Sequence, residues 1–303
     1  MAEGALNMLK PPGMTSHDVV DGVRRIVQMR RVGHAGTLDP AAAGVMLLML
    51  GSTTRLSEYM TGCDKTYRAE ISLGIGTDTL DGEGKIVARE SAAGIGRDDL
   101  EQALQGLTGS LSLPPPMHSA VWHDGRRLYQ IARAGDSVEV EDRKSRVHRF
   151  ELLEFEMGET ARALTEVECS SGTYVRSLAA AVGEAVGCLA YLSFLVRTAV
   201  GQHSVVDSLT GSELSTAVRE RRLGEVLIRP QDALPPWPRI EVDPTTALAL
   251  CHGVQTPAPP ELMKAERAIA MTGERLLCVV DVIADEEQHL MQPRRVMLSE
   301  DEL

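Results

Sequence analysis

The chain has 303 residues, of which 43% are apolar and 3% aromatic, and its formal net charge is −12. This length and apolar fraction suit one large domain with a smaller one. The charge argues against a uniformly basic nucleic-acid-binding surface, and the low aromatic content argues against a broad base-stacking surface. Residues 231–303 contain 13 acids but only 6 Lys or Arg, so most of the negative charge lies in this segment.

Cysteine usage and hydropathy exclude two further classes. The five cysteines are scattered without a Cys-x-x-Cys pair, which predicts reduced thiols and neither a zinc site nor a disulfide framework. The first residues lack a basic segment followed by a long apolar stretch, and no apolar run approaches the length of about 18 residues that a membrane helix needs. We therefore expect a cytoplasmic monomer without a metal.

The N-terminal part predicts a helix whose C-terminal end is basic. Turn-forming residues fill positions 10–16, and Thr15 or Ser16 can cap a helix over 17–29. Arginines near the end of this helix suit the helix dipole, and they equally suit a surface that faces RNA. They are Arg24, Arg25, Arg30 and Arg31.

The segment 31–44 predicts a structured polar loop. It contains three glycines, and Asp39 precedes Pro40, which pushes the Asp39 backbone toward an extended form. The wholly apolar run 45–50 follows at once and ties the loop to the core. One carboxylate and one imidazole, Asp39 and His34, in such a loop are typical of an active site. An Asp that merely turns the chain before a proline explains the same pattern.

Beyond this loop, apolar periodicity predicts alternating strands and helices. We expect strands over 45–50, 65–74, 138–140, 147–153 and 163–169, with a hairpin turn at Gly125. We expect helices over 53–60, 98–107, 128–133, 174–186 and 209–225, whereas 189–196 fits a helix or a strand. The polar turn over 77–84 has spaced acids but lacks the terminal acid of a calcium loop.

A proline-rich segment marks the best domain boundary. Four prolines fall within residues 229–238, a composition typical of linkers. Short strands are expected after it, over 239–242, 268–271, 276–283 and 296–298. They indicate a small all-β module.

Four motifs occur along the chain in the same order as in a known protein family. They are Lys-Pro-Pro-Gly-Met-Thr-Ser at 10–16, Gly-His-Ala-Gly-Thr-Leu-Asp-Pro at 33–40, Lys-Thr-Tyr at 65–67 and Ser-Gly-Thr-Tyr-Val-Arg at 171–176. Together they resemble the bacterial TruB-type tRNA pseudouridine synthases over nearly the whole chain. The turn at 77–79 and the pair at 197–198 fit as well.

The resemblance implies an α+β fold, with a mixed, largely antiparallel sheet flanked by helices and a small C-terminal all-β PUA-like module. It places a catalytic domain over 1–232 and the module over 233–303. It also implies an isomerase that converts a uridine of the tRNA T-loop, at position 55, to pseudouridine. The expected partner is the T-arm of tRNA, and no cofactor is implied.

The resemblance also assigns roles to particular residues. Asp39 becomes the catalytic carboxylate, which attacks either C1′ of the ribose or C6 of the uracil, and Arg176 pairs with it. Tyr67 lies against the target base, and His34 helps to extrude the nucleotide, at a cost of a few kcal/mol of stacking. Tyr174 and Leu195 line the same pocket.

Basic side chains outside the pocket are candidates for contacts with the RNA backbone. They are Arg30, Arg31, Arg126, Arg127, Arg143 and Arg146, and binding through them should weaken with salt.

The sequence departs from the family pattern at Ala43, His118 and Trp122. Trp122 replaces a usual lysine and so removes a phosphate contact from its hairpin. Two other functions stay open. One is a tRNA-binding or folding module with secondary or lost catalysis. The other is a hydrolase with Asp39 as its nucleophile, which needs a second acid such as Asp78 or Asp81.

Overall fold

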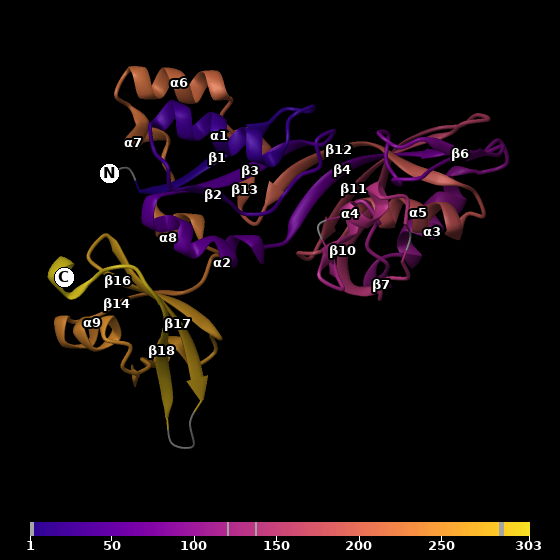
Figure 1. The fold of residues 1–303 in the computed structure, drawn as a ribbon. Coiled ribbons are helices and arrows are strands. Elements are labelled where there is room, and N and C mark those ends of the chain that lie inside the picture. The colour runs from indigo at the N-terminus through magenta and orange to yellow at the C-terminus, as the bar shows by residue number, and fades with distance from the viewer. Residues whose placement is uncertain (1–2, 120, 137, 285–287) are drawn as a thin grey trace.

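The structure is a computed structural model, and it describes residues 3–119, 121–136, 138–284 and 288–303. Within these residues the two larger sheets form two lobes (Figure 1). The larger lobe carries most of the chain, and the smaller one is formed by its C-terminal part. The proline-rich segment, which includes α8 (Pro230–Ala233), connects them.

The larger sheet contains nine of the described strands, and its order mixes early and late segments of the chain. β2 (Val32–His34) pairs with β3, and β13 (His203–Ser204) pairs with β12. Among the described pairs of this sheet only β3–β12 is parallel, so the expected mixed, largely antiparallel sheet is confirmed. The main path runs β1 (Gly4–Lys10), β3 (Ala43–Leu50), β12 (Ala190–Val200), β4 (Lys65–Leu73), β11 (Arg162–Cys169), β10 (Arg143–Glu156) and β7 (Gly109–Leu113).

Strand β3 explains why residues 45–50 are continuously apolar. Met46 and Leu48 pack against α1 (Ser16–Val27) and α6 (Gly211–Arg219) on one face of the sheet. Leu47 and Met49 face the other way, into a cluster that includes side chains of the C-terminal lobe. A strand buried on both faces cannot alternate apolar and polar residues. The second cluster also fixes the small lobe against the large one.

The other half of the large sheet is covered by α5 (Val175–Ala185) and α3 (Arg97–Gly106), which share one core with β4, β11 and β12. Small elements complete this lobe. They are α2 (Ser57–Thr61), α4 (Leu128–Arg133), α7 (Leu223–Val226), the hairpin β5 (Ile75–Thr77) with β6 (Ile86–Arg89), and the hairpin β8 (Trp122–His123) with β9 (Arg126–Arg127).

The C-terminal lobe is a five-stranded sheet with one helix against it. The sheet matches the expected β-module, whereas the helix α9 (Pro244–Cys251), capped by Asp243, was not expected from the sequence. The strands follow the order β14 (Arg239–Glu241), β16 (Arg267–Thr272), β17 (Arg275–Ala284), β18 (His289–Val296) and β15 (Thr256–Pro257).

Several predicted boundaries are wrong. Residues 138–140 form no strand, because Val138 and Val140 instead pack against the small cluster under α4. Of the predicted strand at 296–298, only Val296 lies in a strand, as the last residue of β18, and the ambiguous segment 189–196 belongs to the strand β12. The helix expected over 209–225 is two helices, α6 and α7, separated by Arg221 in a left-handed conformation with φ 59°.

Candidate active site

The loop that carries Asp39 is held on both sides of that residue. The Ser16 hydroxyl donates to the Leu38 carbonyl at 3.1 Å and accepts from the Leu38 amide at 2.9 Å. The buried Lys10 ammonium donates to the carbonyls of Pro40 at 3.0 Å and Ala42 at 2.6 Å. Backbone groups on either side of Asp39 are therefore fixed by the first strand and the first helix.

The loop ends where two strands approach closely. At Gly44, with φ 114°, a Cβ atom would lie 2.1 Å from the backbone oxygen of Arg197. No L side chain fits such a space, so glycine is required for the parallel pairing of β3 with β12. This pairing brings the end of the loop beside Arg197.

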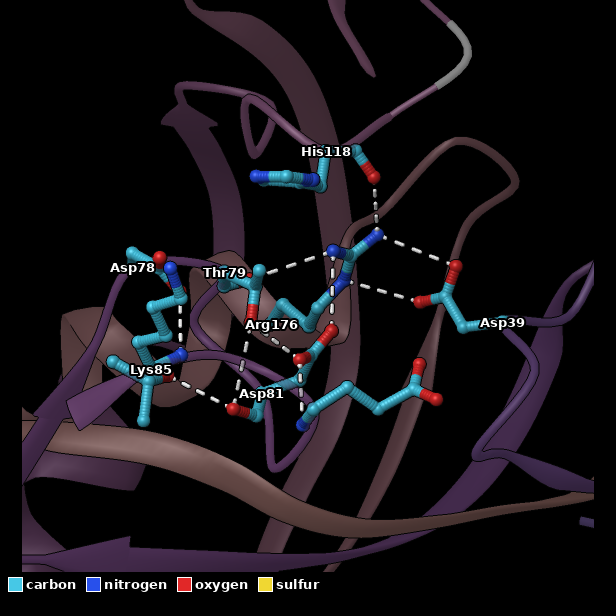
Figure 2. A network of polar contacts seen from close by, with 9 residues as sticks. Asp39, Asp78, Thr79, Asp81, Lys85, His118 and Arg176 are labelled. Carbon is cyan, nitrogen blue, oxygen red and sulfur yellow. Dashed lines mark hydrogen bonds and ion pairs between the residues drawn. The ribbon is translucent and has the colours of Figure 1, made fainter. Parts of the chain in front are cut away.

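Arg176 is the centre of the polar network. It is the second residue of α5, only 6% of its side chain is exposed, and its Nε lies 3.1 Å from Asp39 Oδ2. Its Nη2 lies 3.3 Å from the other oxygen of Asp39, so the guanidinium holds the carboxylate with two nitrogens. Figure 2 shows the carboxylates of Asp39 and Asp81 on different sides of this guanidinium.

Further acceptors complete the network around Arg176. Its Nη1 donates to Asp81 Oδ2 at 3.3 Å, and its Nη2 donates to the His118 carbonyl at 3.0 Å (Figure 2). Asp81 itself accepts from the Thr79 hydroxyl at 2.5 Å. The guanidinium is thus fixed by three segments besides its own, and it cannot turn away from Asp39 without breaking several bonds.

The electrostatics of Asp39 are balanced between burial and charge. Burial raises the pKa of its carboxyl, the Arg176 guanidinium opposes that rise, and the charge of Asp81 adds to it. The carboxyl keeps 41% of its side chain exposed toward the pocket. Arg176 therefore holds the carboxyl in one orientation while part of it stays open to the pocket, which suits a nucleophile that must reach a bound substrate.

Tyr67 and Arg197 form a second buried pair at the pocket. They face each other in the register of β4 and β12, and Tyr67 is 8% exposed. Burial raises the pKa of the Tyr67 hydroxyl, which stays protonated at neutral pH. Arg197 donates from Nε to the Val45 carbonyl at 2.8 Å. Its two Nη atoms donate to the carbonyls of Thr37 and Gly36 at 3.3 and 3.2 Å. Arg197, on β12, therefore connects this strand and β3 to the Asp39 loop.

These residues surround a cavity of 440 Å³. Five of the side chains that the sequence singled out line it together. They are Asp39, Tyr67, Tyr174, Arg176 and Leu195. The structure thus assembles residues that lie up to 156 positions apart in the sequence.

His34 is not among the residues that line the cavity. It lies on β2, and its Nδ1 is buried without a hydrogen-bond partner among the described residues. Burial lowers the pKa of its imidazole, so the ring is neutral at pH 7.

The candidate RNA-binding arginines occupy three places. Arg30 and Arg31 are exposed after α1, with Arg31 donating to the Thr54 hydroxyl. Arg126 and Arg127 lie on the β8–β9 hairpin, whereas Arg143 and Arg146 are exposed on β10. Of these, Arg146 reaches the pocket rim through its backbone, which exchanges hydrogen bonds with Ser170.

Sequence reasoning missed the role of four charged groups that build the site, three of them buried and one, Asp81, partly buried. They are Lys10, Lys65, Asp81 and Arg197. Asp81 was weighed only as the second acid of a hydrolase. In the structure it is an acceptor for Arg176. A signal was present in three cases, since Lys10, Lys65 and Arg197 each stand in a motif that the sequence singled out.

Two absences hold for the residues that the structure describes. They contain no group of three or more His, Cys, Asp or Glu side chains placed to bind a metal ion. No helix among them is both long enough and apolar enough to cross a membrane.

Comparison with known proteins gives the site its context. A family model described as the N-terminal domain of TruB family pseudouridylate synthases matches residues 24–175. A protein named tRNA pseudouridine synthase B from Symbiobacterium thermophilum is 45% identical over 83% of this chain and 82% of its own length. One of the same name from Moorella thermoacetica is 40% identical over 98% of this chain and 100% of its own length.

Solved structures agree on the fold. A crystal structure of a Cbf5-Nop10-Gar1 complex contains a chain that matches 99% of this one with a TM-score of 0.76 and 23% identity, and the match covers 86% of that chain. The family match includes the Asp39 loop, Tyr67, Asp81 and the beginning of α5. The chain belongs to the TruB family of pseudouridylate synthases.

Proposed function

We propose that this protein converts a uridine of tRNA to pseudouridine and that Asp39 is its nucleophile. The observation that carries this proposal is the Asp39 carboxylate, which Arg176 holds with two nitrogens at the wall of a nucleotide-sized cavity. Membership of the family supports the reaction class. The tRNA substrate is supported by the names of full-length relatives.

The reaction is an isomerisation and balances without a co-reactant. The bond between N1 of uracil and C1′ of the ribose breaks, and a bond between C5 and C1′ forms. C5 loses a proton and N1 gains one, so no electrons enter or leave. The ionised Asp39 carboxylate begins the exchange by attacking C1′ or C6, and either route divides one hard step into two easier ones.

The other pocket residues hold the detached base while it turns. Tyr67 lies against the base with its protonated hydroxyl, and Tyr174 and Leu195 complete the wall. Such contacts replace the stacking that the nucleotide loses when it leaves the T-loop. Arg176 keeps Asp39 ionised and aimed.

The finer assignments extend this proposal. The target is position 55 of the T-loop, and the tRNA is bound by the exposed arginines on β10, on the β8–β9 hairpin and after α1. His34 helps to extrude the nucleotide from the T-loop. Residues 1–232 are the catalytic domain of a cytoplasmic monomer, and residues 233–303 are a PUA-like module that orients the tRNA.

The experiment uses the purified protein and an unmodified tRNA transcript, with no added cofactor. We expect pseudouridine at one T-loop position, detected by chemical probing. The Asp39→Asn variant should lose turnover by more than about 10⁴-fold, as when a nucleophile is removed. Asp98→Asn, which changes an exposed acid on α3, is the matched control and should match the wild type.

The outcomes separate the enzyme from its alternatives. Binding of tRNA without pseudouridine formation by the wild type would favour a binding or folding module. Equal activity in Asp39→Asn would remove this residue from its assigned role. Release of free uracil would indicate a hydrolase.

A further inference from the structure

Trp122 is an exposed aromatic residue in a chain that has few aromatics. The sequence contains two tryptophans, and 59% of Trp122 is exposed. Its neighbour Val121 is 7% exposed and packs with Leu128 and Ile131 in a small apolar cluster. Because side chains alternate along a strand, the Trp122 ring lies on the opposite, outer face of the β8–β9 hairpin.

A cation holds this ring in place. The guanidinium carbon of Arg127 lies 4.1 Å from the ring centroid, which is a close cation–π contact. The two residues are direct register partners across the hairpin. Asp124 and Gly125 close it with positive φ angles of 46° and 78°, as a tight two-residue hairpin turn requires. The exposed ring is therefore preorganised.

The hairpin is built onto the wall of the catalytic pocket. The Leu128 amide donates to the Val121 carbonyl at 2.8 Å, and the Tyr129 amide donates to the Ser119 carbonyl at 3.0 Å. Ser119 and Tyr129 both line the pocket, and the preceding residue, His118, accepts from Arg176. An RNA with one nucleotide in the pocket therefore has its neighbouring nucleotides beside this hairpin.

The charge of the hairpin favours RNA over an apolar protein partner. Arg126 is exposed, and Arg127 adds a second positive charge, against the single acid Asp124. This is a basic site on a protein with a net charge of −12. Aromatic rings combined with arginines are the usual means of holding unpaired bases, because every base presents a π face.

We propose that Trp122, supported by Arg127, is a stacking platform for one unpaired nucleobase of the bound RNA. The inference rests on the proposed function, since it assigns a contact to the same substrate outside the catalytic pocket. The ligand is a nucleobase next to the extruded uridine. Stacking there adds affinity for the RNA and leaves the chemical step unchanged.

Fluorescence reports the stacking directly. In the Asp39→Asn protein with Trp237→Phe, Trp122 is the one remaining tryptophan, and the probe is an unmodified tRNA transcript. We expect quenching of the Trp122 emission as the tRNA binds. The matched protein, Asp39→Asn with Trp122→Phe, reports on Trp237 and should show a smaller change.

Affinity and its salt dependence separate stacking from a phosphate contact. Trp122→Ala should raise the Kd for the tRNA about tenfold, and Trp122→Phe should stay within about threefold of the wild type. The slope of log Kd against log salt should not change in either variant. Arg126→Ala, the contrasting variant, should lower that slope by about 1. Val206→Ala, at another exposed apolar side chain, should change nothing.

Three results would overturn the proposal. They are no quenching of Trp122, a Kd for Trp122→Ala within about twofold of the wild type, or a Phe variant as weak as the Ala variant. Wild-type pseudouridine formation is measured on the same transcript. If the wild type forms pseudouridine and Trp122→Ala binds normally, only the stacking inference fails. If the wild type forms none, the proposed function fails, and quenching still decides the stacking.

Discussion

Two of the cavities in the described part of the chain differ in character. The cleft between the lobes has a volume of 710 Å³, against 440 Å³ for the Asp39 pocket. Arg267 lies over both Tyr59 and Trp237, with its guanidinium carbon 5.2 and 5.0 Å from their ring centroids. The two rings meet edge to face at 5.4 Å. These are favourable contacts that hold the lobes together.

The Asp39 pocket, the smaller of the two, contains the charges that are costly to bury. Glu58, which lines the cleft, pairs with Arg295, and these side chains are 56% and 37% exposed. In the pocket, Arg176 is 6% exposed and holds two carboxylates, one of which has a raised pKa. Buried charges are costly, so a fold keeps them where chemistry uses them. The larger of these two cavities is therefore not the one that contains the candidate catalytic residues.

The strongest test of this contrast is Arg176→Met. Loss of the guanidinium leaves the Asp39 carboxylate without a fixed orientation and beside the negative charge of Asp81. We therefore expect turnover to fall by about 10³-fold. The pKa of Asp39 rises, since the group that opposed its rise is gone, and the acid limb of the kcat/KM profile moves to higher pH. Single-turnover rates measured across pH follow both effects, and the Kd for tRNA is measured beside them. A loss confined to Kd would contradict the pairing.

Asp81→Asn should have a smaller effect and the opposite pH shift. Arg176 keeps both bonds to Asp39, so we expect about a tenfold loss of turnover from looser positioning. The Asp81 charge raises the pKa of Asp39, and its removal therefore moves the acid limb to lower pH. The pH dependence of kcat/KM is the measurement. An unchanged limb would show that Asp81 has no electrostatic effect on Asp39.

Trp237→Ala tests the cleft and should affect catalysis least. Loss of the ring contacts with Tyr59 and Arg267 should lower the free energy of unfolding by about 2 kcal/mol. Turnover at saturating tRNA should change by less than about twofold. Denaturant unfolding and single-turnover kinetics check these values, with Trp237→Phe as the milder control. A large loss of turnover with normal stability would mean that the cleft belongs to the catalytic machinery.

The sequence was most informative about elements whose pattern is local. Thr15 caps α1 as expected, and the apolar run before Leu50 is the buried strand β3. The strand expected at 138–140 is wrong, and its two valines pack against a cluster that includes residues of α4, a contact that periodicity does not reveal. The helix α9 was missed because short apolar helices and strands look alike in sequence.

For the site, the sequence identified the residues better than it identified their partners. The order of the motifs identified Asp39, Tyr67 and Arg176 as candidate site residues, and all three line one pocket. Asp81 could not be placed from spacing, since its contact with Arg176 spans 95 positions and depends on how the β5–β6 hairpin folds back. The position of His34 outside the cavity likewise depends on the pairing of β2 with β3.

The place of β12 in the large sheet has a consequence for synthesis of the chain on the ribosome. This strand, residues 190–200, lies between β3 and β4, which are made more than a hundred residues earlier. Until β12 emerges, Tyr67 and the Asp39 loop lack the residue that connects them, Arg197. Pairings of such long range form slowly, because loop closure must precede the contacts that compensate for it. In a nascent chain the Asp39 pocket is therefore incomplete until β12 has been made.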